Sequence, residues 1–325
     1  MELRKRSCYA YFHRDEIYKM KKILLTGATG FIGNVLGKKL FEAGYHLKVV
    51  SRSQKMAQEK LLFPAEIIEC DLNRMALPES DFQDVFCLIH LAGETIDGRW
   101  TKEKKKNILE SRENSSINIL KNRPSSVESI FSVSAQGIYG DQGNESLDED
   151  AKLGSDFLAD VCKKWEKPFQ DLMMMTTKQV TVFRLGLVLS KKGGALKKML
   201  PIFSKNLGAP LGSGNQWMSW IHLDDVCQAF LQGLNNKNYT GVINLVSDHP
   251  VTNNEWTKTL CRTLKVGQLP TIPRFLLKAL FGEMSSLLLN SIKVNPKKLK
   301  ELQFNYLYPD LKLALEKELL DETVL

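Results

Sequence analysis

The sequence of 325 residues predicts an α/β fold, in which a doubly wound parallel sheet carries a smaller, mainly helical C-terminal lobe. Three observations lead to this prediction. Short apolar runs recur along the chain up to Val246, as the buried strands of a parallel sheet do. Segments of helical periodicity separate most of these runs, which indicates right-handed crossovers between parallel strands. Beyond Pro250 the pattern becomes helical.

The first strand is expected at 21–26, a short apolar run that ends at a glycine. A helix follows, with Ile32, Leu36 and Leu40 on one face. Gly44 ends this helix. The remaining strands of the sheet are expected at 46–50, 66–70, 85–91, 129–134, 180–185 and 242–246.

Other segments flank this sheet domain of residues 20–247. Residues 1–19 mix charges without periodicity, so we expect an N-terminal extension that is disordered or precedes a natural start at Met20. Residues 186–214 are rich in Gly, Lys and Pro and lose strand periodicity. We expect them to join a C-terminal helical substrate lobe, residues 248–325, over the carboxyl ends of the strands.

The composition excludes several classes of function. The net charge of +8 suits nucleic-acid binding, but Glu103 interrupts the densest basic cluster, 102–106. We interpret that cluster as a solvated helix face, since no zinc-finger, helix-turn-helix or RNA-recognition signature accompanies it. The six cysteines form no Cys-x-x-Cys pair, which indicates a reducing compartment and no metal site. No apolar run approaches the roughly 18 residues that cross a bilayer, so a cytoplasmic location is expected.

The segment after the first strand has the pattern of a dinucleotide-binding loop, because it follows a strand and opens a helix. Gly27 permits the tight turn, Gly30 lets a pyrophosphate approach the backbone, and Gly33 allows the helix to pack on the strand. The helix N-terminus favours the phosphates. A plain strand-to-helix turn is the alternative. The residues expected to bind the cofactor here are Gly27, Thr29, Gly30, Phe31, Ile32 and Gly33.

The end of the second strand indicates which cofactor is bound. A site for NAD usually carries Asp or Glu about 20 residues beyond the glycines, where it binds the ribose 2′-hydroxyl. Here Ser51 and Arg52 stand at that place. A guanidinium can pair with a 2′-phosphate, so NADP(H) is favoured over NAD(H), and residues 20–247 are expected to form an NADP-binding Rossmann domain. The alternative is that Arg52 points into solvent.

Two later strand ends fit the same ligand. Asp71 and Leu72 follow the third strand, where an aspartate can accept a hydrogen bond from the adenine amine. Leu91, Ala92 and Gly93 follow the fourth strand and are small enough to let a cofactor lie across the sheet edge. Ordinary strand-end turns would be the alternative, but both segments occur in the expected order.

Longer motifs accompany this pattern between about 21 and 320. They include H-L-A-G-E-T-I-D-G-R-W, S-V-S-A-Q-G-I-Y-G-D-Q-G, V-C-K-K-W-E and G-S-G-N-Q-W-M-S-W-I-H-L-D-D. These motifs resemble those of the extended, epimerase-like short-chain dehydrogenase/reductases, and more narrowly the bacterial and organellar epimerase family group related to sugar-nucleotide epimerases. The resemblance names no substrate. It implies NADP(H) binding, with contacts from Ser51, Arg52, Leu91, Ala92 and Arg112.

Enzymes of that superfamily move a hydride, and normally use a Tyr-x-x-x-Lys pair with a serine from the fifth strand. Ser134 ends the fifth strand and fits the serine role. The helix expected at 157–166 carries no tyrosine, so Tyr139, in the loop after Ser134, is the predicted catalytic phenol. Lys163 or Lys164 could supply charge, or form a solvated pair. Tyr-x-x-x-Lys does occur at two places that do not fit, Tyr18/Lys22 and Tyr308/Lys312.

A second candidate region follows Gly212. Gln216, Trp217 and Trp220 stand near a glycine turn and are predicted to stack on and hydrogen-bond a substrate ring. The alternative is that Trp220 belongs to the core. The turn 191–194, Lys-Lys-Gly-Gly, is expected either to bind an anionic group or to be a flexible loop.

These observations predict an NADP(H)-binding oxidoreductase or epimerase that acts on a small polar or sugar-nucleotide-like molecule. The missing Tyr-x-x-x-Lys pair supports a second hypothesis, an NADPH-binding sensor or structural protein with little or no turnover. We expect no nucleic-acid, membrane or metal partner, and the sequence is compatible with a homodimer.

Overall fold

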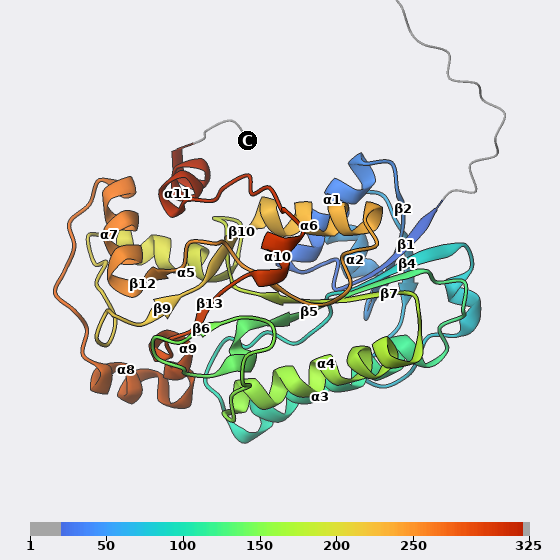
Figure 1. Cartoon of the computed structure of the whole chain (residues 1–325), viewed down its shortest axis with the longest axis horizontal. Helices are drawn as coiled ribbons and strands as arrows, with labels where there is room; N and C mark the ends of the chain where they lie inside the picture. The colour runs from blue at the N-terminus through green and yellow to red at the C-terminus, as the bar shows by residue number, and fades with distance from the viewer. Residues whose placement is uncertain (1–20, 321–325) are drawn as a thin grey trace, which may run out of the picture.

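A parallel seven-stranded sheet forms the centre of the molecule (Figure 1). The computed structural model describes residues 21–320, so the predicted extension at 1–19 lies outside the described residues. The strand order is β11-β7-β5-β4-β1-β2-β3, and every neighbouring pair is parallel. The order reverses between β1 and β4, and in open α/β sheets such a reversal opens a crevice at the carboxyl ends of the strands. The predicted doubly wound fold is confirmed.

The seven strands fall where the apolar runs predict them. Each expected strand agrees with the structure to within one residue at either end. The strands are β1 (Lys22–Thr26), β2 (His46–Ser51), β3 (Glu66–Glu69), β4 (Val85–His90), β5 (Ser129–Ala135), β7 (Gln179–Leu185) and β11 (Gly241–Leu245).

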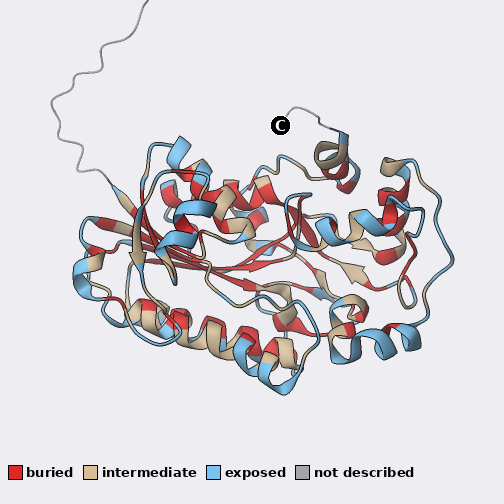
Figure 2. Cartoon of the chain, turned by 180° about the vertical axis from the view of Figure 1, so that it is seen from behind, coloured by how far each residue is buried: buried red, intermediate tan, exposed pale blue. Residues whose placement is uncertain are grey.

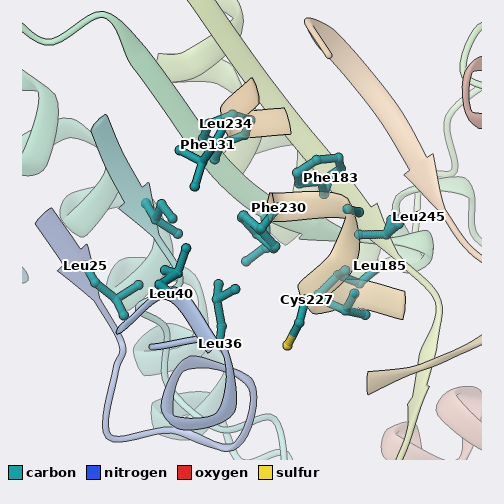
Figure 3. Close-up of a cluster of buried hydrophobic side chains, with 14 of the residues drawn as sticks. Leu25, Leu36, Leu40, Phe131, Phe183, Leu185, Cys227, Phe230, Leu234 and Leu245 are labelled. Atoms are coloured by element: carbon teal, nitrogen blue, oxygen red, sulfur yellow. The ribbon is translucent and has the colours of Figure 1, made fainter. Parts of the chain in front are cut away.

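Helices cover both faces of this sheet (Figure 1). One face carries α1 (Phe31–Glu42) and α6 (Leu223–Asn235), and the other carries α3 (Lys102–Lys121) and α4 (Phe157–Met175). Leucines from α1 and phenylalanines from α6, β5 and β7 fill the first interface, as Figure 3 shows. Shorter elements in this half are α2 (Gln54–Lys60), η1 (Glu79–Phe82), η2 (Gln136–Tyr139) and β6 (Ser146–Leu147).

The remaining elements form a lobe beside the carboxyl ends of the strands. Three small two-stranded sheets tie it together, pairing β10 with β8, β12 with β9 and β13 with β6. Its strands are β8 (Leu187–Leu189), β9 (Trp217–Met218), β10 (Trp220–His222), β12 (Val251–Thr252) and β13 (Lys293–Val294). Its helices are α5 (Gly194–Phe203), α7 (Asn253–Leu264), α8 (Arg274–Phe281), η3 (Gly282–Ser285), α9 (Ser286–Leu289), α10 (Lys297–Glu301) and α11 (Leu311–Leu320).

One expectation about this lobe needs correction. The sequence loses strand periodicity over 186–214, yet that segment holds β8 and α5. The helix forms because Leu196 and Phe203 pack into an apolar cluster with Trp220 and Trp256. Burial follows the layers, with the sheet buried and the outer helix faces exposed (Figure 2). Over residues 21–320, no helix is both long and apolar enough to cross a membrane.

Candidate functional site

The glycine loop between β1 and α1 is shaped by two positions that leave no space for a side chain, Gly27 and Gly33, and by a third, Gly30, where the space is tight. Gly27 has φ +70°, and a Cβ there would lie 2.7 Å from the main-chain carbonyl carbon of Leu91. A Cβ on Gly33 would lie 2.2 Å from the carbonyl oxygen of Gly27, and one on Gly30 would lie 3.1 Å from the same oxygen. The roles predicted for the glycines in the turn and in the helix–strand contact agree with this geometry.

The N-terminus of α1 leaves its backbone donors available to an anion. Its N-cap residue, Gly30, has no side chain to cap the helix, and the first turn holds no acidic residue. The first N–H groups of a helix lack partners within the helix, and they carry the positive end of its dipole. A diphosphate therefore fits this loop, both in charge and in the space that the glycines leave.

A buried hydrogen-bond centre joins the ends of β1 and β4 beside this loop. Thr26 Oγ1 lies 2.9 Å from His90 Nδ1 and accepts bonds from the main-chain N–H groups of Leu91 and Ala92, each at 3.2 Å. Burial lowers the pKa of His90 to about 3, so this imidazole is neutral. The bonds hold the Leu91–Ala92 backbone against Gly27, as the predicted cofactor edge requires.

Arg112 belongs to the same region of the molecule. Its guanidinium lies over the Trp165 ring, 4.8 Å from the centroid, and a Cβ on Gly93 would lie 3.3 Å from its Cζ. Arg112 also donates a hydrogen bond from Nη1 to the Ile108 carbonyl at 3.1 Å. The structure thus brings Gly27, the 91–93 segment and Arg112 together.

The end of β2 presents the predicted 2′-phosphate residues at the surface. Arg52 is exposed and forms no ion pair among residues 21–320. Ser51 Oγ donates to the Ser53 carbonyl at 3.1 Å, which shapes the turn into α2. Sequence reasoning missed a carboxylate at this place. Glu69 Oε2 accepts a hydrogen bond from the Gln54 N–H at 2.7 Å. Glu69 pairs with Ser51 across the two strands, and this register could have revealed it.

Asp71 and Leu72 differ in what they offer a cofactor. Asp71 is half-buried, and its carboxylate is shared between the Asn73 N–H and Arg74. Leu72 is 5% exposed and packs in the cluster between the sheet and α3. The predicted contact of Leu72 with the cofactor therefore needs correction, because the Leu72 side chain is packed in the core.

Ser134 lies at the end of β5, where the sequence predicts it. Its hydroxyl is buried and has no nitrogen or oxygen partner among the described residues. A neighbouring group is the thiol of Cys162 on α4. Burial raises the pKa of Cys162 to about 11, so the thiol keeps its proton.

The catalytic role predicted for Tyr139 is contradicted by its position. Its side chain is fully buried, and its hydroxyl lies 2.7 Å from Asn244 Oδ1 and accepts a bond from Arg184 Nη1 at 2.9 Å. Arg184 in turn makes two 2.9 Å bonds to the Glu166 carboxylate. Burial raises the pKa of Tyr139 despite the adjacent guanidinium. Tyr139 therefore anchors the loop after β5 and does not face a substrate.

Two of the three predicted substrate residues turn out differently, and the role of Trp217 stays a prediction. Trp220 is fully buried in the C-terminal cluster and donates its indole N–H to the His249 carbonyl, so a stacking role is wrong. Gln216 is 6% exposed and donates to the carbonyls of Leu211 and Leu288, so it holds a loop. Trp217 is half-buried, with Lys293 Nζ 4.1 Å from its ring centroid.

The turn at 191–194 touches the glycine loop, which the sequence did not indicate. A Cβ on Gly193 would lie 2.3 Å from the ring of Phe31. Glu318 from α11 holds the turn, because its Oε2 accepts from the Lys191 N–H at 2.6 Å. Its Oε1 lies 3.1 Å from His222 Nε2. Burial alone would raise the pKa of Glu318, but these bonds hold it below its usual value. The predicted anion site in this turn is thus filled by the chain's own carboxylate.

A cavity of about 580 Å³ lies between the start of α4 and the helices of the C-terminal lobe. We call it the α4–α8 cavity. Leu158 on its wall packs against the loop after β5, since a Cβ on Gly137 would lie 3.5 Å from Leu158 Cβ. Through Leu158 the cavity therefore adjoins the loop that follows β5. Its lining comprises Trp100, Lys105, Asp156, Phe157, Leu158, Arg274, Lys278, Gly282, Glu283, Ser285, Ser286, Leu289 and Asn290.

Among the described residues, no group of three His, Cys, Asp or Glu side chains could hold a metal ion. Sequence reasoning also missed most of the α4–α8 cavity, because its walls come from three segments that lie far apart in the sequence. The one local signal was the aromatic and apolar pair Phe157-Leu158 at the start of a helix that should carry a tyrosine.

Comparison with known proteins gives two matching family models. The model described as the NAD dependent epimerase/dehydratase family matches residues 23–245. A second model, described as a domain of unknown function (DUF1731), matches residues 272–318. The first covers the whole central sheet, and the second covers α8 to α11 apart from the end of α11.

Individual relatives match over nearly the same length. An epimerase family protein SDR39U1 homologue, chloroplastic, from Arabidopsis thaliana is 36% identical over 90% of this chain and 85% of its own length. An epimerase family protein of Staphylococcus aureus is 33% identical over 91% of this chain and 98% of its own. The crystal structure of the human epimerase family protein SDR39U1 with NADPH superposes with a TM-score of 0.79, at 28% identity, over 92% of this chain and 99% of that one.

Proposed function

This chain belongs to the NAD-dependent epimerase/dehydratase family, and from that premise we propose that it is an NADP(H)-binding oxidoreductase or epimerase acting on a small polar or sugar-nucleotide-like substrate. The observation that carries the proposal is the glycine loop, where Gly27 and Gly33 exclude side chains beside an uncapped helix N-terminus. The human relative that was solved with NADPH supports the choice of cofactor.

Each part of the cofactor has a group in the chain that would hold it. The loop from Gly27 to Gly33 would bind the diphosphate through backbone N–H groups. Arg52 would pair with the 2′-phosphate, and Asp71 would accept from the adenine amine. The 91–93 segment, fixed by Thr26, would support the nicotinamide end.

When bound, the nicotinamide supplies the chemistry of hydride donation and acceptance. The chain's own task is to hold the substrate oxygen and manage its proton. Ser134 is our candidate for holding that oxygen, because its hydroxyl has no nitrogen or oxygen partner among residues 21–320 and lies at the end of β5. The adjacent Cys162 thiol keeps its proton because it is buried, so it places no charge beside that hydroxyl.

The experiment has two parts. NADPH and NADH are titrated against the full chain by calorimetry, and NADPH oxidation is then followed by absorbance across a panel of carbonyl compounds. We expect NADPH to bind, and a carbonyl substrate to be reduced more slowly by Ser134→Ala than by the wild type. General acid–base groups contribute about 10² to 10⁴ in rate, which bounds that effect. Failure of both nucleotides to bind would contradict the proposal.

A second candidate function has a specific observation in its favour. Tyr139 is buried in a structural network, and α4 presents Leu158 and Cys162 toward the end of β5 where a catalytic tyrosine is expected. A protein that uses NADPH as a sensing or structural ligand would need no such tyrosine. Tight NADPH binding without oxidation by any carbonyl would favour this function. A cytoplasmic location and a homodimer stay predictions from the sequence.

A further inference from the structure

We propose that the substrate of this site is an organic anion, whose carboxylate or phosphate pairs with Arg274 and Lys278 of α8 while its apolar body lies in the α4–α8 cavity. The inference rests on the proposed function, because it names the substrate class of the same site. The cavity volume of about 580 Å³ lies in the range of small-molecule sites, about 300–1,000 Å³.

The charges in the cavity divide into those with partners and those without. Lys105 and Glu283 pair with each other at 2.6 Å, so they neutralise one another. Asp156 accepts from the Ala159 N–H at 2.9 Å and from Asn290 Nδ2 at 3.2 Å. The carboxylate of Asp156 thereby occupies the N-terminus of α4, and a second anion is not favoured there.

Arg274 and Lys278 are the other two cations that line the cavity. Neither forms an ion pair with any residue between 21 and 320. They stand four residues apart on α8, so both side chains lie on one face of that helix, and both line the cavity. One acidic group can therefore contact both, with the guanidinium offering two parallel hydrogen bonds.

The opposite wall of the cavity is apolar. Trp100 and Phe157 meet edge to face with ring centroids 5.3 Å apart, and Leu158 and Leu289 continue the surface. Lys105 Nζ lies 4.6 Å from the Phe157 centroid, so the Lys105–Glu283 pair closes one side of this wall. A ligand with a flat or apolar body would be desolvated here while its acidic group faces α8.

Two lysines of the cluster at 102–106 take part in this arrangement, while Lys102 and Lys106 are exposed, as the interpretation as a solvated face predicts. Lys104 and Lys105 are half-buried and bind Glu94 and Glu283. Lys104 and Lys105, at this end of α3, are thus paired with carboxylates of the same chain. The cavity cations that form no ion pair among the described residues lie on α8.

The test uses the full chain saturated with NADPH and three probes that share a phenyl ring: benzoate, phenyl phosphate and benzyl alcohol. Dissociation constants are measured by NMR titration at millimolar concentrations. We expect at least one acidic probe to bind about 10-fold or more tightly than benzyl alcohol. Tighter binding of benzoate would assign a carboxylate, and tighter binding of phenyl phosphate would assign a phosphate ester.

The variant R274Q/K278Q should remove this preference for acidic probes, while NADPH binding stays at the wild-type level. The matched control is K258Q/R262Q, which removes the same two charges with the same spacing from an exposed face of α7. It should retain the preference.

Equal binding of all three probes, no binding of either acid, or equal losses in both double variants would overturn the inference. Absence of NADPH binding to the wild type would instead overturn the proposed function on which it rests. The two failures are therefore distinguishable.

Discussion

Gly33 shows how a single missing carbon positions the nucleotide loop. An added Cβ would meet main-chain atoms of Gly27 and Ala28, at 2.2 Å and 2.9 Å, and backbone cannot rotate away as a side chain can. Gly33 is helical, so its backbone conformation does not require glycine. The loop requires glycine at this position because a Cβ has no space.

We expect Gly33→Ala to lower the free energy of unfolding by about 1–3 kcal/mol, as overpacking does, and to weaken NADPH binding. Urea unfolding and calorimetric titration measure the two effects. Gly267→Ala is the matched control, since the nearest atom to its added Cβ is 3.9 Å away. Wild-type stability of Gly33→Ala would contradict this prediction, because it would show that the loop backbone shifts to make room for the Cβ.

Arg52 is the residue that we propose discriminates between NADPH and NADH. It is exposed and forms no ion pair among the described residues, so its guanidinium is available to a phosphate. We expect Arg52→Ala to weaken NADPH by about 10- to 100-fold and to leave NADH within about twofold, because only NADPH carries the 2′-phosphate. Fluorescence titration of both nucleotides measures this. Equal losses for NADPH and NADH would contradict the assignment, and Glu69→Gln would then be the next variant to examine.

At the scale of elements, the contact between α4 and β7 depends on a buried ion pair. Glu166 on α4 and Arg184 on β7 are 0% and 4% exposed, and two 2.9 Å bonds join them. Burial alone would lower the pKa of Arg184, but the Glu166 carboxylate raises it well above its usual value. Arg184 is therefore charged in the folded protein.

Removing one partner leaves the other charge buried and uncompensated. We expect Glu166→Met or Arg184→Met alone to cost about 3–5 kcal/mol, and the double variant to cost less than the sum of the two. A double-mutant cycle in urea measures the difference. Additive losses would mean that the pair contributes no coupling, and that the contacts of Arg184 with Tyr139 and Glu149 carry its effect.

The central elements could be predicted because their signals are local. Each strand is an apolar run of four to seven residues, and the glycines that follow β1 have a fixed spacing. The role of Tyr139 could not be predicted in this way. Its partners, Arg184 and Asn244, lie 45 and 105 residues along the chain, and no pattern near Tyr139 distinguishes a buried phenol from a catalytic one.

The smaller lobe follows the same rule. Trp220 was placed at a substrate surface because it stands near a glycine turn, but tertiary packing against Leu196 and Trp256 buries it. The α4–α8 cavity is built by α8 and α9 packing against α3 and α4, and only the fold brings these segments together.

For the whole molecule, the neutral imidazole of His90 predicts how stability changes with pH. Its pKa is about 3 in the folded protein and 6.5 in an unfolded chain, so the unfolded state binds the proton first as the pH falls. The contribution of neutral His90 to the free energy of unfolding is complete above pH 6.5 and is lost progressively between pH 6.5 and pH 3.

Between pH 7 and pH 5 we expect His90 to lower the free energy of unfolding by about 2 kcal/mol. Other groups titrate in this range as well, so the comparison is between the wild type and His90→Gln, each measured by urea unfolding at both values. The wild type should lose more stability than the variant over this interval. Equal losses would mean that the pKa of His90 is not lowered in the folded protein.

Glu318 sets a limit on how far the chain can be shortened at its carboxyl side. A gene product that stopped before α11 would retain all seven strands of the sheet and the entire glycine loop. It would nevertheless lack the carboxylate that binds the Lys191 N–H and His222. Because Gly193 rests on Phe31, the released turn would lie against the first residue of α1. A premature stop codon just before α11 would therefore disturb the start of α1, which lies near the other end of the sequence.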